Sequence, residues 1–304
     1  MFEINVNDET ATLSSVILGT AQSLGGTPTL EQAYDARSKE SIRLGIYPEE
    51  KDLIKEMESF HDILKKYGVQ VFRPDLLNDT NQVYTRDIGF VIGNKFVIPN
   101  IISDREHEKD GIASFIENIS QDQLIRMPVG ARAEGGDVMV WKGKLFVGYS
   151  EQADFDEYYV SRTNLAGLQF LEKAFPEMEV RGFELVKSDE EPRNSALHLD
   201  CCFQPIGNNQ CIICQKGFKN NTDFEFLIQH FGVENCIILS EEEMYEMNSN
   251  VFSISPNVIV VGENFSKLNL ELEQRGFKVE KIRYNEVRKM GGLFRCSTLP
   301  LLRR

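Results

Sequence analysis

Short strand-like runs alternate with amphipathic helical stretches along this chain, and the elements recur in a similar order. The first unit reads as a strand at 14–20, a helix at 49–66 with its apolar residues on one face, and a strand at 68–75. Because a single unit cannot bury its apolar face alone, the repeat predicts an α/β fold of modules packed around a common axis. Four further units of strand, strand, helix and strand follow at 85–127, 137–184, 199–239 and 251–284.

No stretch rich in proline, glycine or serine divides the sequence into independently folding halves. A chain of 304 residues is about twice the common domain size, but the unbroken repeat favours a single domain over residues 1–304. The segment 21–47 fits none of the five units. We expect this segment to form a lid or an access loop.

The charge balance narrows the range of partners. The chain has 33 Lys and Arg against 47 Asp and Glu, which gives a formal net charge of −14. Such a chain repels polyphosphate, so nucleic-acid binding is not expected, and a cationic small molecule is favoured as the ligand. Hydrophobic residues make up 41% and charged residues 26%, as in ordinary globular proteins.

The N-terminal residues lack the basic and then apolar order of a secretory signal, and no apolar run approaches the length of a spanning helix. We therefore expect a cytoplasmic protein without membrane contact. The six cysteines lie in the second half of the chain without the spacing of a disulfide scaffold, which favours reduced thiols. The C-x-x-C at 211–214 has no second ligand pair and predicts a buried strand, so neither a metal nor another cofactor is expected.

Four segments place polar or reactive side chains beside glycines or at strand ends, where irregular backbone can present them to a cavity. Three of them fall near the start of a different module, and the last closes the fifth. Equivalent ends of modules around an axis converge, so these segments are expected to meet at one site. They are the segments 84–87, 134–137, 198–200 and 291–296.

The side chains of these segments suit chemistry on a planar cation. Two carboxylates can accept parallel N–H bonds from a guanidinium and leave its carbon open to attack from one face. The thiolate of Cys296 would add to that carbon, and His198 would move protons to and from the departing and incoming groups. Burial would raise the pKa of the thiol, so an imidazolium or the bound cation must supply compensating charge.

Each of these residues also has a structural interpretation. Cys296 could be a small buried apolar residue and His198 a hydrogen-bonded core histidine. Glu134 could be a solvated charge in a hairpin, and Asp87 could pair with Arg86 or cap a turn. The functional interpretation therefore depends on their occurring together.

In this order, the four segments resemble those of the guanidino-modifying enzymes, which include arginine deiminase, dimethylarginine dimethylaminohydrolase and the glycine and inosamine amidinotransferases. The resemblance implies the pentein fold, a five-bladed α/β propeller with pseudo-fivefold symmetry, and many relatives form homodimers. It also implies roles by motif position. Cys296 is then the nucleophile, His198 the general acid and base, and Asp87 with Asp200 the pair that grips the guanidinium. Glu134 is then the acid that helps to bind the guanidinium and orients the histidine.

The resemblance leaves the reaction open between two classes. Glu134-Gly-Gly-Asp137 and the run from Arg295 to Pro300 are similar to the deiminases and hydrolases, in which water releases a ureido product from a covalent amidino-cysteine. The start of the helix at Thr163-Asn164 and the residues after His198 are as similar to the amidinotransferases, which pass the amidino group from arginine to an amine. A non-catalytic binding module on the same propeller is the third hypothesis.

The motifs that contact the carboxylate of free arginine in this family are incomplete in the chain. Gln152 stands where deiminases have Arg-Thr, and Met290 stands where they have an arginine before the final Gly-Gly. Arg162 remains as the candidate for binding a substrate carboxylate. The sequence does not identify which guanidino compound is the substrate.

Overall fold

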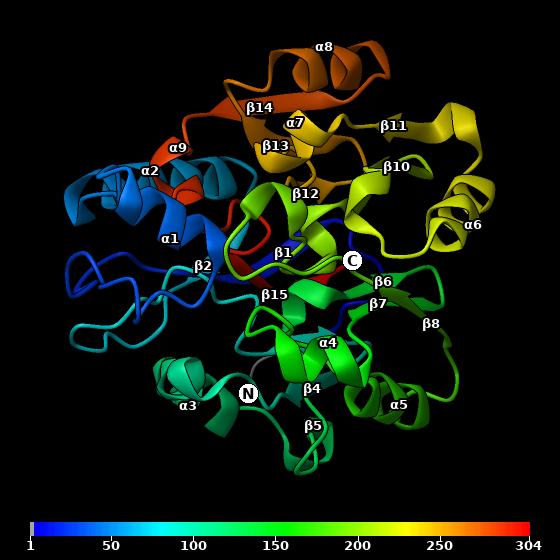
Figure 1. Cartoon of the computed structure of the whole chain (residues 1–304). Coiled ribbons are helices and arrows are strands. Elements are labelled where there is room, and N and C mark those ends of the chain that lie inside the picture. The colour runs from blue at the N-terminus through cyan, green and yellow to red at the C-terminus, as the bar shows by residue number, and fades with distance from the viewer. Residues whose placement is uncertain (1–2) are drawn as a thin grey trace.

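The computed structural model describes residues 3–304, whose strands form five sheets of three strands each (Figure 1). In every sheet the middle strand pairs antiparallel with one neighbour and parallel with the other. The orders are β15 (Thr298–Arg303), β1 (Leu13–Leu18), β2 (Gln70–Phe72); β3 (Phe90–Ile92), β4 (Lys95–Ile98), β5 (Leu124–Arg126); β6 (Val138–Trp141), β7 (Lys144–Tyr149), β8 (Glu179–Glu184); β9 (Phe203–Ile206), β10 (Gln210–Ile213), β11 (Cys236–Ile238); and β12 (Phe252–Ser255), β13 (Val258–Gly262), β14 (Lys278–Ile282).

The crossover between the two parallel strands of each sheet contains an α-helix, and the longer one is named below where there are two. Figure 1 shows these five helices around the rim of the molecule with the sheets inside. The five-module α/β propeller predicted from the repeat is confirmed. The crossover helices are α2 (Glu50–Lys66), α3 (Ala113–Glu117), α5 (Leu165–Ala174), α6 (Asn221–Phe231) and α8 (Ser266–Gln274).

The remaining helices lie within these crossovers or between the modules. The α-helices are α1 (Ala36–Arg43), α4 (Gln152–Glu157), α7 (Glu241–Tyr245) and α9 (Asn285–Arg288). The 3₁₀ helices are η1 (Ser103–Ile112), η2 (Gln121–Gln123), η3 (Gly135–Asp137), η4 (Pro192–Asn194), η5 (Leu199–Cys201), η6 (Gln215–Gly217) and η7 (Val233–Asn235). Within residues 3–304, none of the helices is long and apolar enough to cross a membrane.

Two sequence predictions at the ends of the first and second modules were wrong. The segment 291–296 does not close the fifth module, because β15 follows it and pairs antiparallel with β1 in the first sheet, with Val16 opposite Pro300. The strand predicted from Thr85 begins only at Phe90. The backbone N–H of Arg86 donates to the carbonyl of Cys296 at 3.1 Å, so this stretch joins two modules instead of extending a ladder.

The segment 21–47 includes α1 and packs against the C-terminal part of the chain. The side chain of Asp35 accepts the backbone N–H of Ser38 at 2.8 Å and thereby caps this helix. The hydroxyl of Ser41 donates to the carbonyl of Lys289 at 2.8 Å. These contacts hold the start of α1 beside the loop that leads to Cys296. The single domain expected over 1–304 also covers residues 1–2, which lie outside the described residues.

A buried ionic network crosses the interior between modules. The guanidinium of Arg295, fully buried, lies 3.0 Å from Glu9 and 2.9 Å from Asp200, and it also donates to the carbonyl of Val138. Burial would raise the pKa of Glu9, but the charges of Arg295 and Arg86 outweigh it and lower the pKa to about 2. The network links the N-terminal segment with two other modules directly beneath Cys296.

Candidate active site

The structure brings Cys296 and His198 to the wall of one cavity of about 300 Å³. Asp87 and Arg162, two further residues singled out from the sequence, line the same cavity, whereas Glu134 and Asp200 lie behind it. The remaining lining residues are Tyr34, Asp35, Tyr84, Arg105, Leu197, Met290 and Gly291.

The convergence has a simple topological origin, because each site segment directly precedes the strand that pairs antiparallel with the middle strand of a sheet. Segments 84–87, 134–137 and 198–200 precede β3, β6 and β9 in this way, and 291–296 precedes β15. The fifth such position, before β12, holds Asn250, which the sequence analysis did not single out. Its place in the repeat was the signal that could have found it.

The side chain of Asn250 contacts both the thiol of Cys296 and the backbone beside it. Its Nδ2 lies 3.0 Å from Cys296 Sγ. Its Oδ1 accepts the backbone N–H of Arg295 at 3.1 Å and that of Cys296 at 3.3 Å. An amide N–H directed at the sulfur stabilises a thiolate over a thiol. The opposite influence comes from Asp200, whose Oδ2 is 3.6 Å from the sulfur.

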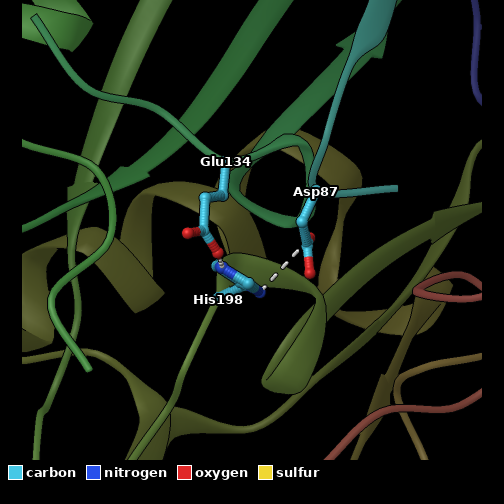
Figure 2. A group of neighbouring side chains, drawn as sticks. All are labelled: Asp87, Glu134 and His198. Carbon is cyan, nitrogen blue, oxygen red and sulfur yellow. Dashed lines mark hydrogen bonds and ion pairs between the residues drawn. The ribbon is translucent and has the colours of Figure 1, made fainter. Parts of the chain in front are cut away.

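His198 lies between two carboxylates, as Figure 2 shows. Its Nε2 is 2.9 Å from Glu134 Oε2, and its Nδ1 is 3.7 Å from Asp87 Oδ1. Nδ1 is buried without a hydrogen-bond partner in the described chain. Gly136 makes room for the ring, because a Cβ there would lie 2.5 Å from Nδ1.

Two arginines support the carboxylates. Arg105, which the sequence analysis missed, donates from η1 to Asp87 and Glu108 at 2.8 Å each. Arg162 Nη1 donates to Glu134 Oε2 at 3.1 Å, and its other two nitrogens donate to the backbone carbonyls of Tyr34 and Tyr159. No pattern in the sequence distinguishes Arg105 from the other charged residues of the exposed run around it.

The electrostatics of the three central groups differ. Burial would lower the pKa of His198, but Asp87, Glu134 and Asp137 raise it to about 9. Burial would also raise the pKa of Glu134, but Arg162, His198 and Arg105 hold it well below its usual range. For Cys296, burial and the charges of Asp200 and Asp87 all raise the pKa. The site therefore combines an imidazolium, an ionised Glu134 and a protonated thiol.

Asp87, Glu134 and His198 also form the one group within residues 3–304 whose ligand atoms could surround a metal ion, with all atoms within 4.8 Å of one another. The guanidinium of Arg105 already bonds to Asp87 and lies 3.5 Å from Glu134, and Arg162 also contacts Glu134. A metal ion bound by these acids would have to compete with the guanidinium contacts that they already make.

A family model described as "N,N dimethylarginine dimethylhydrolase, eukaryotic" matches residues 31–303, which include every site residue described above. The chain belongs to this family. YkgA, an uncharacterized protein of Bacillus subtilis (strain 168), is 30% identical over 225 residues, which cover 73% of this chain and 70% of YkgA. The arginine deiminase of Streptococcus pneumoniae (strain CGSP14) is 26% identical over 73% of this chain and 61% of its own length.

The fold agrees with this family membership. The amidinotransferase SxtG of Microseira wollei, from the saxitoxin biosynthetic pathway, superposes with a TM-score of 0.76 and 17% identity. The match covers 99% of this chain and 97% of SxtG. The chain thus shares its pentein fold with an amidinotransferase, and its relatives include an arginine deiminase.

Proposed function

We propose that the protein is a cysteine-dependent hydrolase that cleaves a C–N bond of a guanidino group through a covalent amidino-cysteine. The observation that carries the proposal is the shared cavity wall of Cys296 and His198, with buried acids on both sides of the imidazole. A nucleophile and a proton carrier facing one small cavity are the two groups that such a displacement needs.

Substrate binding prepares the thiol for attack in this proposal. The guanidinium enters the cavity beside Asp87, while Asp200 contacts the sulfur of Cys296. The positive charge of the guanidinium offsets the burial and the carboxylates that raise the pKa of Cys296. The thiol therefore loses its proton to solvent as the cation binds. The N–H of Asn250 then stabilises the thiolate.

The thiolate attacks the guanidinium carbon, and a C–S bond forms. The protonated His198 gives its proton to the departing nitrogen, so that ammonia or an amine leaves. The neutral His198 next takes a proton from water, whose oxygen attacks the same carbon. The C–S bond breaks, and a ureido product and the thiolate result. Glu134 keeps the imidazole oriented and stabilises its charged form, while Arg162 and Arg105 keep Glu134 ionised.

An amidinotransferase is the second candidate, in which an amine takes the place of water in the last step. A hollow of about 440 Å³ adjoins the catalytic cavity and shares Asp35, Leu197 and Gly291 with it. Such a hollow has room for an acceptor amine. The two reactions share every step up to the amidino-cysteine.

The test is a screen of guanidino compounds with and without glycine and ornithine, in which ammonia, ureido product and transferred amidine are measured together. Hydrolysis predicts ureido product without an acceptor, and transfer predicts product only with one. In parallel, 2-chloroacetamidine should label a single cysteine, Cys296, and Cys296→Ser should abolish both labelling and turnover. Labelling at no cysteine, or at the buried Cys211, would favour a non-catalytic binding module.

A further inference from the structure

The backbone just before His198 is held by a lysine from the preceding module. Lys187 lies in the loop after β8, and its Nζ donates to the carbonyl of Ala196 at 2.9 Å and to that of Leu197 at 2.8 Å. The backbone N–H of Ala196 also donates to the carbonyl of Val186 at 2.9 Å. Leu197 lines both the catalytic cavity and the adjoining 440 Å³ hollow. The loop after β8 therefore fixes the part of the cavity wall that includes His198.

The backbone just after the histidine is held by a carboxylate. Asp137 Oδ1 accepts the N–H of Leu199 at 2.9 Å, and Oδ2 accepts the hydroxyl of Thr163 at 2.7 Å. The oxygen of that hydroxyl accepts the backbone N–H of Glu134 at 3.2 Å, so the partner of the imidazole is joined to the same group. Gly148 leaves room for the carboxylate, because a Cβ there would lie 2.4 Å from Asp137 Oδ1.

Lys187 is buried in a way that is unusual for a lysine. It is 8% exposed and forms no ion pair within residues 3–304, and both of its side-chain hydrogen bonds go to the segment before the histidine. Burial lowers the pKa of Lys187 and outweighs the opposing effect of the acidic groups that face it. The titratable and charged groups around the ammonium are Asp137, Arg162, Cys201 and Cys202. Burial of an ammonium without a close carboxylate costs free energy, so a contribution beyond stability is expected from it.

We infer, building on the proposed hydrolase function, that Lys187 is a positioning residue for the proton transfer by His198. Lys187 fixes the two carbonyls before the histidine, and Asp137 fixes the N–H after it. Between these two points the imidazole is held against Glu134 and beside Asp87. Lys187 acts through the histidine and does not line the catalytic cavity. A displacement of about 1 Å at a reacting group can lower a rate on the order of 100-fold.

The test is the variant Lys187→Met, which keeps an unbranched apolar side chain and removes the N–H donors. We expect kcat to fall about 10- to 100-fold and KM to change less than threefold, because Asp87 and Cys296 lie on other segments. The alkaline limit of kcat/KM should move to lower pH, since a displaced imidazole is stabilised less by Glu134 and Asp87. Labelling of Cys296 by 2-chloroacetamidine should persist.

Lys219→Met is the matched control, because Lys219 pairs with Asp154 and Glu184 on the surface of the molecule. It should leave kcat and the alkaline limit unchanged. Lys187→Gln keeps an N–H donor on a shorter side chain and should recover part of the kcat that Lys187→Met loses. The glutamine variant also serves for the same measurements should the methionine variant not fold.

The outcomes separate this inference from the hydrolase function. Suppose that the Lys187 variants are less stable to denaturant but keep the wild-type kcat and alkaline limit. Lys187 is then structural only, and the inference is overturned while the hydrolase function stands. A wild-type protein that turns over no guanidino compound, and whose Cys296 is not labelled by 2-chloroacetamidine, would instead overturn the hydrolase function and this inference with it.

Discussion

Asn250 shows how much of the site depends on single hydrogen bonds. Its amide contacts the sulfur of Cys296 and two backbone N–H groups in the loop that carries it. In this buried site, hydrogen bonds to a charged atom are worth about 1.5–3 kcal/mol. The residue therefore acts on the reactivity of the thiol and on the position of its backbone together.

Replacing Asn250 with alanine should lower kcat/KM about 10- to 100-fold, because the thiolate loses its N–H donor. The measurement is the pH dependence of Cys296 alkylation by a neutral haloacetamide, which should shift to higher pH in the variant. Asn248→Ala, in the same segment but without a contact to the sulfur, should leave the pH dependence unchanged. An unshifted profile for Asn250→Ala would show that the amide only fixes the backbone.

His198 predicts an alkaline limit to activity. Its pKa is raised to about 9, so the proton donor of the first step is present below that pH and is lost as the pH rises through it. We expect kcat/KM to fall above about pH 9 while alkylation of Cys296 still increases. Glu134→Gln should move this limit to lower pH. Burial lowers the pKa of His198, and the variant has one fewer negative charge to raise it. An alkaline limit of kcat/KM that is the same in Glu134→Gln as in the wild type would contradict the stabilisation of protonated His198 by Glu134.

At the scale of the elements, the positions before the first strand of each sheet carry the site. Four of these five segments were predictable, because reactive residues stand beside glycines or at strand ends in the sequence. Asn250 was overlooked although it stands at the equivalent position of the fifth module, because a lone asparagine before a strand is as typical of a turn. The boundary at Thr85 was also missed. There, the contact between modules at Arg86 decides where the strand begins.

The start of η3 gives a test at this scale. Gly136→Ala should displace the imidazole of His198, because the added Cβ would lie 2.5 Å from Nδ1, and kcat should fall at least tenfold. Gly276→Ala is the control, since its Cβ would meet open space while its φ of +88° still makes alanine unfavourable. The control should lose some stability and keep its kcat. Equal kcat values for the two variants would rule out the steric role of Gly136.

At the scale of the whole molecule, the number of modules was predictable but the closure of the ring was not. Hydrophobic periodicity is local, and it indicated five units correctly. The pairing of β15 with β1 joins residues 13 and 303, and the network around Arg295 joins segments from several modules. Partners so distant in sequence leave no trace in local patterns. Arg105 was missed for the same reason.

The ionic network predicts a large cost for Glu9→Gln. The change leaves the buried charge of Arg295 with one fewer partner, and breaking a buried pair typically costs about 3–5 kcal/mol of the free energy of unfolding. Chemical denaturation measures this loss. Glu3→Gln, which breaks an exposed pair with Arg304, is the control and should have little effect. A comparable, small effect of both changes would show that the network is not needed for stability.

The antiparallel partner of β1 is made from residues 298–303, two positions after the nucleophile. During synthesis on the ribosome, the first sheet must therefore wait, with one edge uncovered, until residues 298–303 have emerged. The pairing of β15 with β1 also brings Cys296 into contact with the other modules. Fragments released before that point would lack both the closed ring of modules and the assembled site around Cys296, and would therefore be catalytically inactive.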